Sequence, residues 1–496
     1  MAIPKVCGLE TEYGILVRGA ENNPVTASAL LINSYMASIG RQVHFDPTSE
    51  TPAQDARFSL GEVAEDYDPE VEYIPVNAVL GNGARYYVDH AHPEMSTPEV
   101  RDALEAVTWD RAGDEIVARS MEVASQSLPD GVELLIHKNN SDGKGNSYGC
   151  HENYLVDRTI PFGAIIKAVM PHFVTRQVFC GAGKVGIERP GVPITTGEYQ
   201  LSQRADFFEE EVGLETTVRR PIVNTRDEPH GDASRFRRLH VIAGDANMSE
   251  VATFLKVVTT SMILATAEDL ASTSFPEIAR PVQAIRAVSH DPSLRSTIEL
   301  ADGRRARAIE VQWELYSLVE RWADKFGLDA VGERAGALGL AMWSEVLADL
   351  ETNPMQAADR VDWVAKMRLL DGYASRNGLH TGDLKLRAID LQYHDLRRDR
   401  CLARRVGLKR LIDETDINAA MLIPPDSTRA YFRGRCVEKF GDAVIAANWD
   451  SLVFDLGIDP LRRVPMDDPL RGTADLVANV IDESSTVLEL VQRLGA

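Results

Sequence analysis

Three features of the sequence predict an α+β fold. Short segments in which apolar and polar residues alternate, the pattern typical of strands, are concentrated before about residue 244. After that residue the apolar positions recur at helical spacing, and a proline-containing break at 423–425 precedes a short final segment. We therefore expect a large domain over residues 1–422 and a small C-terminal domain over residues 423–496.

The expected elements can be placed in chain order. Strands are expected at 6–13, 85–89, 133–138, 148–156 and 237–242, and a helix at 27–39. Gly40 is expected to end that helix, and Ser249 to cap a long apolar helix that begins after it. Farther on, Ile309 and Val319 belong to one apolar helical face, which predicts a core position for both.

The composition is that of a globular protein. Hydrophobic residues make up 44% of the 496 residues and charged residues 26%, which is enough for a sizeable core. The net charge of −22 argues against nucleic acid as a partner, because binding to phosphates needs a basic surface. The sequence has no zinc-finger spacing either.

The cysteines and the apolar segments indicate the cytoplasm. The five cysteines are scattered and form no CxxC pair, so neither a disulfide framework nor a structural zinc site is expected. The N-terminus lacks the apolar core of a signal peptide. The longest apolar run, 251–267, is interrupted by Lys256 and several threonines, so we expect a buried helix and no membrane partner.

The segment from about residue 41 to 74 differs from its surroundings. It is rich in Asp and Glu, poor in Lys and Arg, and its aromatic residues are too irregularly spaced to form one face. We interpret it as a long, mobile, acidic insertion. Its role is either that of a simple surface loop or that of a lid or regulatory segment.

Polar residues spaced by two along the expected strands carry the chemical signal. Residues two apart in a strand share a face. The pairs and triplets are Glu10 and Glu12; Arg85, Tyr87 and Asp89; His151 and Asn153; and Arg238 and His240. Carboxylates gathered on a sheet repel one another unless cations neutralise them, and they suit Mg²⁺ shared with nucleotide phosphates. The alternative is an ordinary solvated strand face.

Other sequence signals are weaker. There is no P-loop, no glycine-rich dinucleotide turn, no GxSxG and no HExxH. A local concentration of arginines is either a solvated surface or a site for anions, and its members are Arg219, Arg220, Arg226, Arg235, Arg237 and Arg238. His230 is either a turn residue or part of the site.

Six motifs, in order, resemble the Pup ligase and depupylase family. They are GLETEYG, NGARYYVDHAHPEMSTPE, KNNSDGKGNSYGCHENYL, SQRADF, NTRDEPH and RRLHVIAGDANMSE, and the similarity extends over nearly the whole chain. The family is related to glutamine synthetase and to γ-glutamyl-cysteine ligases. The resemblance therefore implies a curved antiparallel sheet covered by helices, with a small C-terminal domain.

Two features resemble the depupylase branch of that family rather than the ligase branch. One is the acidic insertion, and the other is the short spacing DHAHPE between Asp89 and Glu94. This branch implies hydrolysis of the isopeptide bond between the C-terminal Glu of Pup and a substrate lysine, and deamidation of a C-terminal Gln of Pup. Pup and pupylated proteins would be the partners. The alternatives are a Pup–protein ligase that forms the bond, and a Pup-binding adaptor without activity.

The resemblance also implies roles for individual residues. Asp89 matches the catalytic aspartate, either as the nucleophile or as the base that activates water. The implied cofactors are Mg²⁺ and ATP, or ADP plus phosphate. The implied magnesium ligands are Glu10, Tyr87 and Glu94, with Glu12 and His240 as further metal-site positions. The implied ATP contacts are Arg85, Thr97 and Trp449, and the candidate substrate contacts are Arg204, Arg226 and Arg238.

Overall fold

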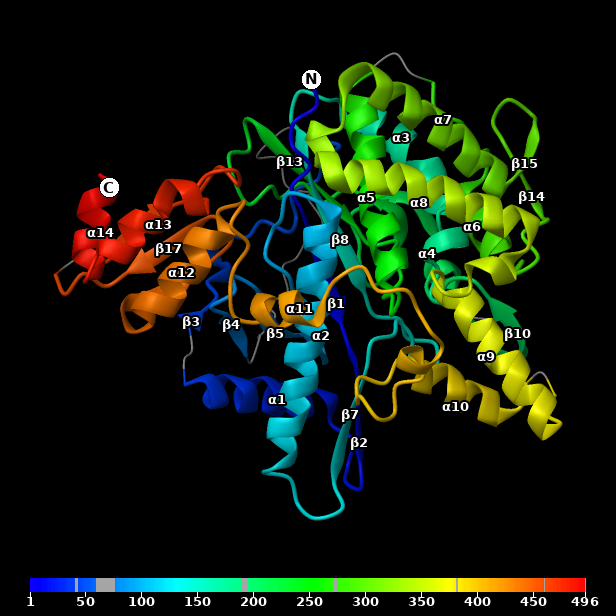
Figure 1. Ribbon diagram of the computed structural model, residues 1–496, viewed down its shortest axis with the longest axis horizontal. Helices are drawn as coiled ribbons and strands as arrows, with labels where there is room; N and C mark the ends of the chain where they lie inside the picture. Colours follow the sequence, from blue (N-terminus) through cyan, green and yellow to red (C-terminus); the bar gives the residue numbers. More distant parts are fainter. Residues whose placement is uncertain are drawn as a thin grey trace.

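The largest element of the fold is a seven-stranded antiparallel sheet (Figure 1). The structure is a computed structural model that describes residues 1–40, 43–58, 76–189, 194–270, 274–380, 382–458 and 460–495. In spatial order the strands are β13 (Phe236–Val241), β8 (Cys150–Asp157), β1 (Cys7–Glu12), β6 (His92–Ser96), β5 (Arg85–Asp89), β4 (Asn77–Val79) and β3 (Val43–His44).

Helices cover one face of this sheet and bury its apolar residues. They are α1 (Pro24–Ile39), α2 (Ala103–Ser125), α3 (Phe162–Thr175) and α5 (Glu250–Asp269). Leu9 and Leu239 share a core with α3 and α5, whereas Tyr86 and Met95 share a core with α1 and α2. Because side chains alternate along a strand, the polar residues of these strands point to the opposite face.

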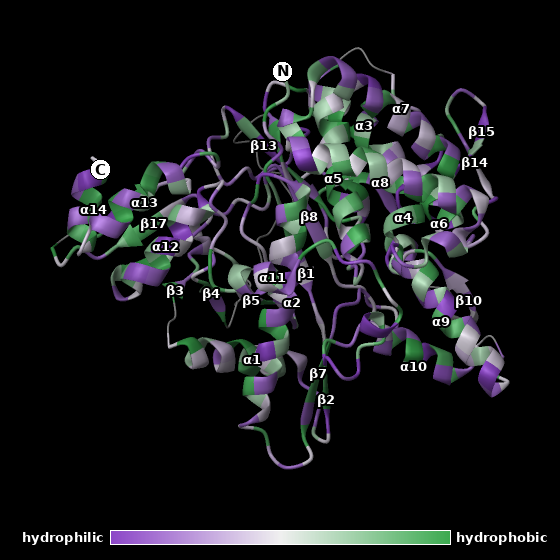
Figure 2. Ribbon diagram, viewed as in Figure 1, coloured by the Kyte–Doolittle hydropathy of each residue, from purple (hydrophilic) through white to green (hydrophobic). Residues whose placement is uncertain are grey.

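The helix α5 lies at the centre of the larger core. Ser249 caps it as expected, since its side chain accepts a hydrogen bond from the backbone N–H of Ala252. Among the described residues, α5 alone has the length and apolar composition of a membrane span, and all of that window is buried inside the protein. Figure 2 shows α5 hydrophobic along most of its length, which agrees with its central position.

The second half of the chain is mainly helical and lies around α5. Its helices are α6 (Pro281–Ser289), α7 (Ala308–Phe326), α8 (Glu333–Thr352), α9 (Asp362–Asn377), α10 (Leu384–Tyr393) and α11 (Glu414–Ala420), and the short α4 (Gln177–Cys180) precedes them. Ile309 and Val319 of α7 are buried, as the helical spacing predicts. With strands concentrated in the first half of the chain and helices in the second, the α+β prediction is confirmed.

Small two-stranded sheets surround this framework. They are β2 (Gly14–Arg18) with β7 (Glu133–His137), β9 (Lys184–Ile187) with β10 (Thr195–Gln200), β11 (Glu210–Gly213) with β12 (Pro221–Asn224), and β14 (Thr297–Glu299) with β15 (Arg305–Arg307). The strand expected at 133–138 is therefore present as β7, but it belongs to a separate ribbon outside the main sheet.

The last part of the chain, orange to red in Figure 1, forms a small unit beside the edge strand β3. It contains α12 (Ala430–Phe440), β16 (Val444–Ala447), β17 (Ser451–Phe454), β18 (Arg462–Pro465), α13 (Ala474–Glu483) and α14 (Val487–Leu494). Its core also includes Val43, Phe45 and Val79 from the main sheet and its edge. The two parts of the chain are thus joined by shared apolar packing.

The acidic segment 41–74 lies partly within the described residues. Residues 43–58 are packed into the fold: they supply β3, Phe45 is 1% exposed, and the backbone of Asp55 forms an isolated antiparallel β-bridge with that of Arg226. This differs from the expected mobile loop. Residues 43–58 are ordered by contacts with distant segments: β3 pairs with β4, and Phe45 packs in the core of the C-terminal unit. Residues 41–42 and 59–74 lie outside the described residues.

Candidate active site

The face of the main sheet that points away from these helices is polar along most of its width. Residues directly opposite each other in an antiparallel sheet point to the same face. The register places Glu10 opposite His151, and Glu94 opposite both Glu12 and Tyr87. Side chains from four strands, β8, β1, β6 and β5, therefore meet on one surface.

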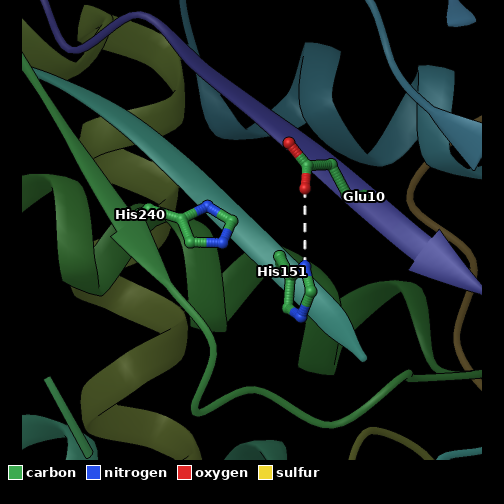
Figure 3. Close-up of side chains that lie close together, drawn as sticks. All are labelled: Glu10, His151 and His240. Atoms are coloured by element: carbon green, nitrogen blue, oxygen red, sulfur yellow. Dashed lines mark ion pairs between the residues drawn. The ribbon is translucent and has the colours of Figure 1, made fainter. Parts of the chain in front are cut away.

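The first cluster on this face consists of Glu10, His151 and His240, which come from three adjacent strands (Figure 3). One ligand atom from each residue lies within 4.8 Å of the other two. The carboxylate of Glu10 is 3.4 Å from Nδ1 of His151, and Asn153 donates a hydrogen bond of 2.7 Å to the other oxygen of Glu10. The two imidazole rings are 5.0 Å apart.

The surroundings keep this cluster ready to bind a cation. Burial alone would raise the pKa of Glu10, but the hydrogen bond with His151 and the electrostatic effects of His240, His151 and Arg238 outweigh it and hold that pKa well below its usual range. Burial, then Arg238 and more weakly Arg226, hold the pKa of His240 well below its usual range. An ionised carboxylate beside a neutral imidazole is a donor set that metals accept.

The second cluster consists of Glu12 at the end of β1, Asp89 at the end of β5, and Glu94 in the middle of β6. Their carboxylate oxygens also lie within 4.8 Å of one another. Burial, and then the charges of Asp89 and Glu12, raise the pKa of Glu94 well above its usual range. Burial opposes ionisation of Glu12 as well, but the hydrogen bond with His92 and the charge of His151 lower its pKa to about 2.

The donor atoms of the second cluster suit magnesium. Glu12 and Glu94 are buried and Asp89 is half-buried, so the three carboxylates repel one another, and a divalent cation between them would remove that repulsion. Mg²⁺ prefers oxygen ligands and retains several waters, so a cluster made only of oxygens fits it. Together, the two clusters contain four of the five residues implied as metal ligands, Glu10, Glu12, Glu94 and His240.

Tyr87, the fifth implied ligand, lies beside Glu94 and packs against Arg85. Its hydrogen bond with Glu94 partly offsets the raised pKa of that carboxyl group. The guanidinium carbon of Arg85 is 3.9 Å from the ring centroids of both Tyr87 and Phe45, and its Nε donates to Asn77 at 2.8 Å. Arg85 is therefore held by stacking at the edge of the polar face.

A cavity continues from Glu10 toward the small C-terminal unit. Its walls include Glu10, Thr97, Arg238, His230 and Trp449. Two of the three implied ATP contacts, Thr97 and Trp449, thus share one cavity, whereas Arg85 is not among the residues that line it. His230 combines both of its expected roles, because it lines the cavity and has a positive φ of 47°.

The arginines near the site do not form one patch. Arg238 lines the cavity and donates to Asn153 at 2.6 Å. Arg204 is buried and donates to the backbone oxygen of Tyr148, and burial, followed by the charge of Arg220, lowers its pKa to about 10.

The remaining arginines of that local concentration are spread around this region. Arg219 and Arg235 are largely exposed and pair with Glu210 and Asp468. These arginines are close together in the sequence, but the turns between β11 and β13 separate them in the structure.

Two histidines of this face are not among the implied metal ligands, although the period-two pattern includes His151. His151 belongs to the first cluster, and His92 lies opposite Asp89, with its Nδ1 3.5 Å from Glu12 and its ring 4.4 Å from that of Tyr148. The period-two spacing of His92 and Glu94 is compatible with a strand. The proline at position 93 and the tight turn after β5 argue against a strand there, so the spacing alone did not predict β6.

The fold and the site define an α+β protein that gathers carboxylates and histidines on the sheet face opposite the covering helices. Comparison with known proteins identifies its family. The chain belongs to the family described as Pup-ligase protein, whose model matches residues 5–453.

Similar proteins extend over the full length of the chain. It is 49% identical to a depupylase from Acidothermus cellulolyticus and 44% identical to a Pup deamidase/depupylase from Mycobacterium tuberculosis, and each comparison covers 99% of both chains. Among solved structures it resembles the Pup ligase PafA in complex with ADP, with a TM-score of 0.74 and 33% identity. That comparison covers 88% of this chain and 98% of the ligase.

Proposed function

We propose that this protein is a depupylase that hydrolyses the isopeptide bond between the C-terminal Glu of Pup and a substrate lysine. It also deamidates a C-terminal Gln of Pup. The observation that carries this proposal is the similarity to proteins named for these two activities, at 49% and 44% identity over 99% of the chain. Pup–protein ligases are 39% and 38% identical, over 82% of the chain. Pup and pupylated proteins are then its partners.

A nucleotide and Mg²⁺ fit the site as cofactors. The ADP-bound ligase supports nucleotide binding, and the cavity beside Glu10, lined by Thr97 and Trp449, is the proposed nucleotide position. We assign ATP, or ADP plus phosphate, to this cavity. Glu10, Glu12 and Glu94 would hold Mg²⁺, which supplies positive charge that neutralises the phosphates and orients their oxygens.

Asp89 is the proposed catalytic residue. It ends β5, its carboxylate lies 2.9 Å from Nδ1 of His90, and it belongs to the second carboxylate cluster. In one scheme Asp89 attacks the γ-carbonyl carbon, the C–N bond breaks as the lysine nitrogen takes a proton from water, and the resulting anhydride is hydrolysed by water. In the other scheme it takes a proton from water, whose oxygen attacks the carbonyl while the amine leaves with a proton.

Arginines of the site are proposed to bind the substrate. Arg204, Arg226 and Arg238 offer guanidinium groups that pair with carboxylates or with the developing negative charge on the carbonyl oxygen. Arg238 supports this role best, since it lines the cavity next to Glu10. The cytoplasm is the proposed compartment, and all five cysteines are free and buried, as a reducing environment allows.

The test compares cleavage with ligation in the same preparations. A Pup–protein conjugate, and separately free Pup with a lysine substrate, are incubated with the wild-type protein and with Asp89→Asn, with and without ATP and Mg²⁺. We expect cleavage only with both cofactors, no net ligation, and loss of cleavage in Asp89→Asn with nucleotide binding retained.

A matched control and two other outcomes complete this test. Glu133→Gln, at an exposed position of β7, should behave as wild type. Net ligation would establish the sister activity, and nucleotide binding without any turnover would favour the adaptor. Cleavage retained in Asp89→Asn would refute the catalytic assignment.

A further inference from the structure

The carboxylate of Glu99 joins the large part of the chain to the small C-terminal unit at the proposed nucleotide cavity. Glu99 lies just after β6 and lines the cavity. One of its oxygens accepts hydrogen bonds from Nε of Arg429 at 2.7 Å and from Nη1 of Arg433 at 3.0 Å. Nη2 of Arg433 binds its other oxygen.

Arg433 extends this connection to Trp449 on the wall of the cavity. Its guanidinium carbon lies 5.0 Å from the centroid of the Trp449 ring, and Nη1 donates to the backbone oxygen of Trp449 at 3.1 Å. Nη2 also donates to the backbone oxygen of Gly83 at 3.0 Å. Arg433 thus contacts Glu99 and Gly83 of the large part and Trp449 of the small unit at the same time.

Close packing fixes the position of the helix α12, which carries Arg433, against the large part of the chain. A Cβ added at Gly434 would lie 2.5 Å from the backbone oxygen of Gly81 and 2.8 Å from Cβ of Pro424. The hydroxyl of Thr428 also donates to the backbone oxygen of Glu99 at 2.6 Å. The helix therefore lies directly against the large part, with the ion pairs of Glu99 at its N-terminal end.

The electrostatics make this contact strongly dependent on Glu99. Arg433 is 1% exposed and Arg429 is 4% exposed, so neither can exchange its carboxylate partner for bulk water. Burial opposes ionisation of Glu99, but Arg433 and Arg429 lower its pKa to about 2, so the carboxylate is charged at neutral pH. Removal of that charge would leave two buried guanidiniums without a counter-ion, which is strongly unfavourable.

We propose that Glu99 is a positioning residue for the nucleotide: through Arg433 it holds Trp449 and the small C-terminal unit against the cavity. The inference rests on the nucleotide cavity of the proposed function. Nucleotide binding and the docking of α12 are then coupled in both directions. A nucleotide that binds against Trp449 must also stabilise the docked position of α12. Without Glu99, Trp449 and the small unit have to be ordered when the nucleotide binds, so the affinity for the nucleotide falls.

The experiment measures ADP affinity by calorimetry in folded protein, well below the thermal transition. The test variant is Glu99→Gln, and Glu99→Asp is a milder second variant that keeps the charge. The matched control is Glu115→Gln, because Glu115 is likewise buried and pairs with two arginines, Arg398 and Arg404, but lies outside this cavity. Both glutamine variants should lower the melting temperature.

The two glutamine variants should differ in nucleotide binding. We expect the ADP dissociation constant to rise about tenfold or more in Glu99→Gln, to rise less in Glu99→Asp, and to stay within about twofold in Glu115→Gln. Hydrogen exchange gives a second readout. In wild type, ADP should slow exchange in α12 and β17, and in Glu99→Gln this protection should be lost.

The outcomes separate this inference from the proposed function. If the wild-type protein binds no ADP, the proposed nucleotide cavity fails. If wild type binds ADP and Glu99→Gln binds it equally well, with the same protection of α12, the positioning role of Glu99 is overturned and its pairs are purely structural.

Discussion

Replacing Glu94 by Gln should stabilise the protein without metal and weaken its response to Mg²⁺. The carboxylate oxygens of Glu12, Asp89 and Glu94 lie within 4.8 Å of one another. Two unit charges at that distance repel by about 3 kcal/mol at an effective dielectric constant of about 20. The amide keeps the size of the side chain and removes one of the three charges.

The sign of this effect depends on pH. Burial and the neighbouring carboxylates raise the pKa of Glu94 in the folded protein well above its usual range. A raised folded-state pKa of an acid leaves stability unaffected below the unfolded-state pKa and reduces it increasingly as pH rises toward the folded-state value. The variant should therefore match wild type near pH 4 and be more stable by up to about 3 kcal/mol near pH 8.

Calorimetry in EDTA, and again with Mg²⁺, measures this prediction. For a chain of 496 residues, with an unfolding entropy of about 2.1 cal/mol/K per residue, about 3 kcal/mol corresponds to a rise of about 3 °C in melting temperature. Mg²⁺ should raise the melting temperature of wild type more than that of Glu94→Gln. Glu115→Gln is a control of opposite sign, since it removes the partner of two arginines. A Glu94→Gln variant that is less stable than wild type at every pH in EDTA would refute the reasoning.

Two further predictions concern acid stability and the backbone of the site. Burial lowers the pKa of His137 from about 6.5 to about 4, so its contribution to stability is lost as pH falls through that window. His137→Asn should reduce the loss of unfolding free energy between pH 7 and pH 4 by about 3 kcal/mol, and an unchanged loss would contradict this. Gly149→Ala would place a Cβ 2.7 Å from Oε1 of Glu12 and closer still to His151. Cleavage should fall at least about tenfold with a small change in melting temperature, whereas Gly163→Ala, with open space around its Cβ, should leave cleavage unchanged.

Local patterns in the sequence predicted the strands and their polar face. The strand at 85–89 coincides with β5, and the Ser249 cap and the helix after it were correct, because alternation and capping depend on neighbouring residues. The shared face of Glu10 and Glu12 follows from period two in the same way. These inferences needed no knowledge of which strands pair.

Features that depend on distant pairing could not be predicted in this way. The meeting of Glu10 with His151 requires the register of β1 against β8, and β3 inside the acidic segment requires pairing with β4. The cavity needs the C-terminal unit to lie against the sheet, and no local pattern encodes that placement. Glu99 illustrates this limit, since both of its arginine partners lie more than 300 residues later in the chain.

The most direct test of the account is the position of the bound cation. Crystals grown with ADP and Mn²⁺, which substitutes for Mg²⁺ and scatters anomalously, should show anomalous peaks on the polar sheet face at the carboxylates of Glu10, Glu12 and Glu94, next to the nucleotide cavity. Cation peaks at an unrelated place, in a protein that cleaves Pup conjugates under the same conditions, would contradict a metal-assisted amide hydrolysis on this face.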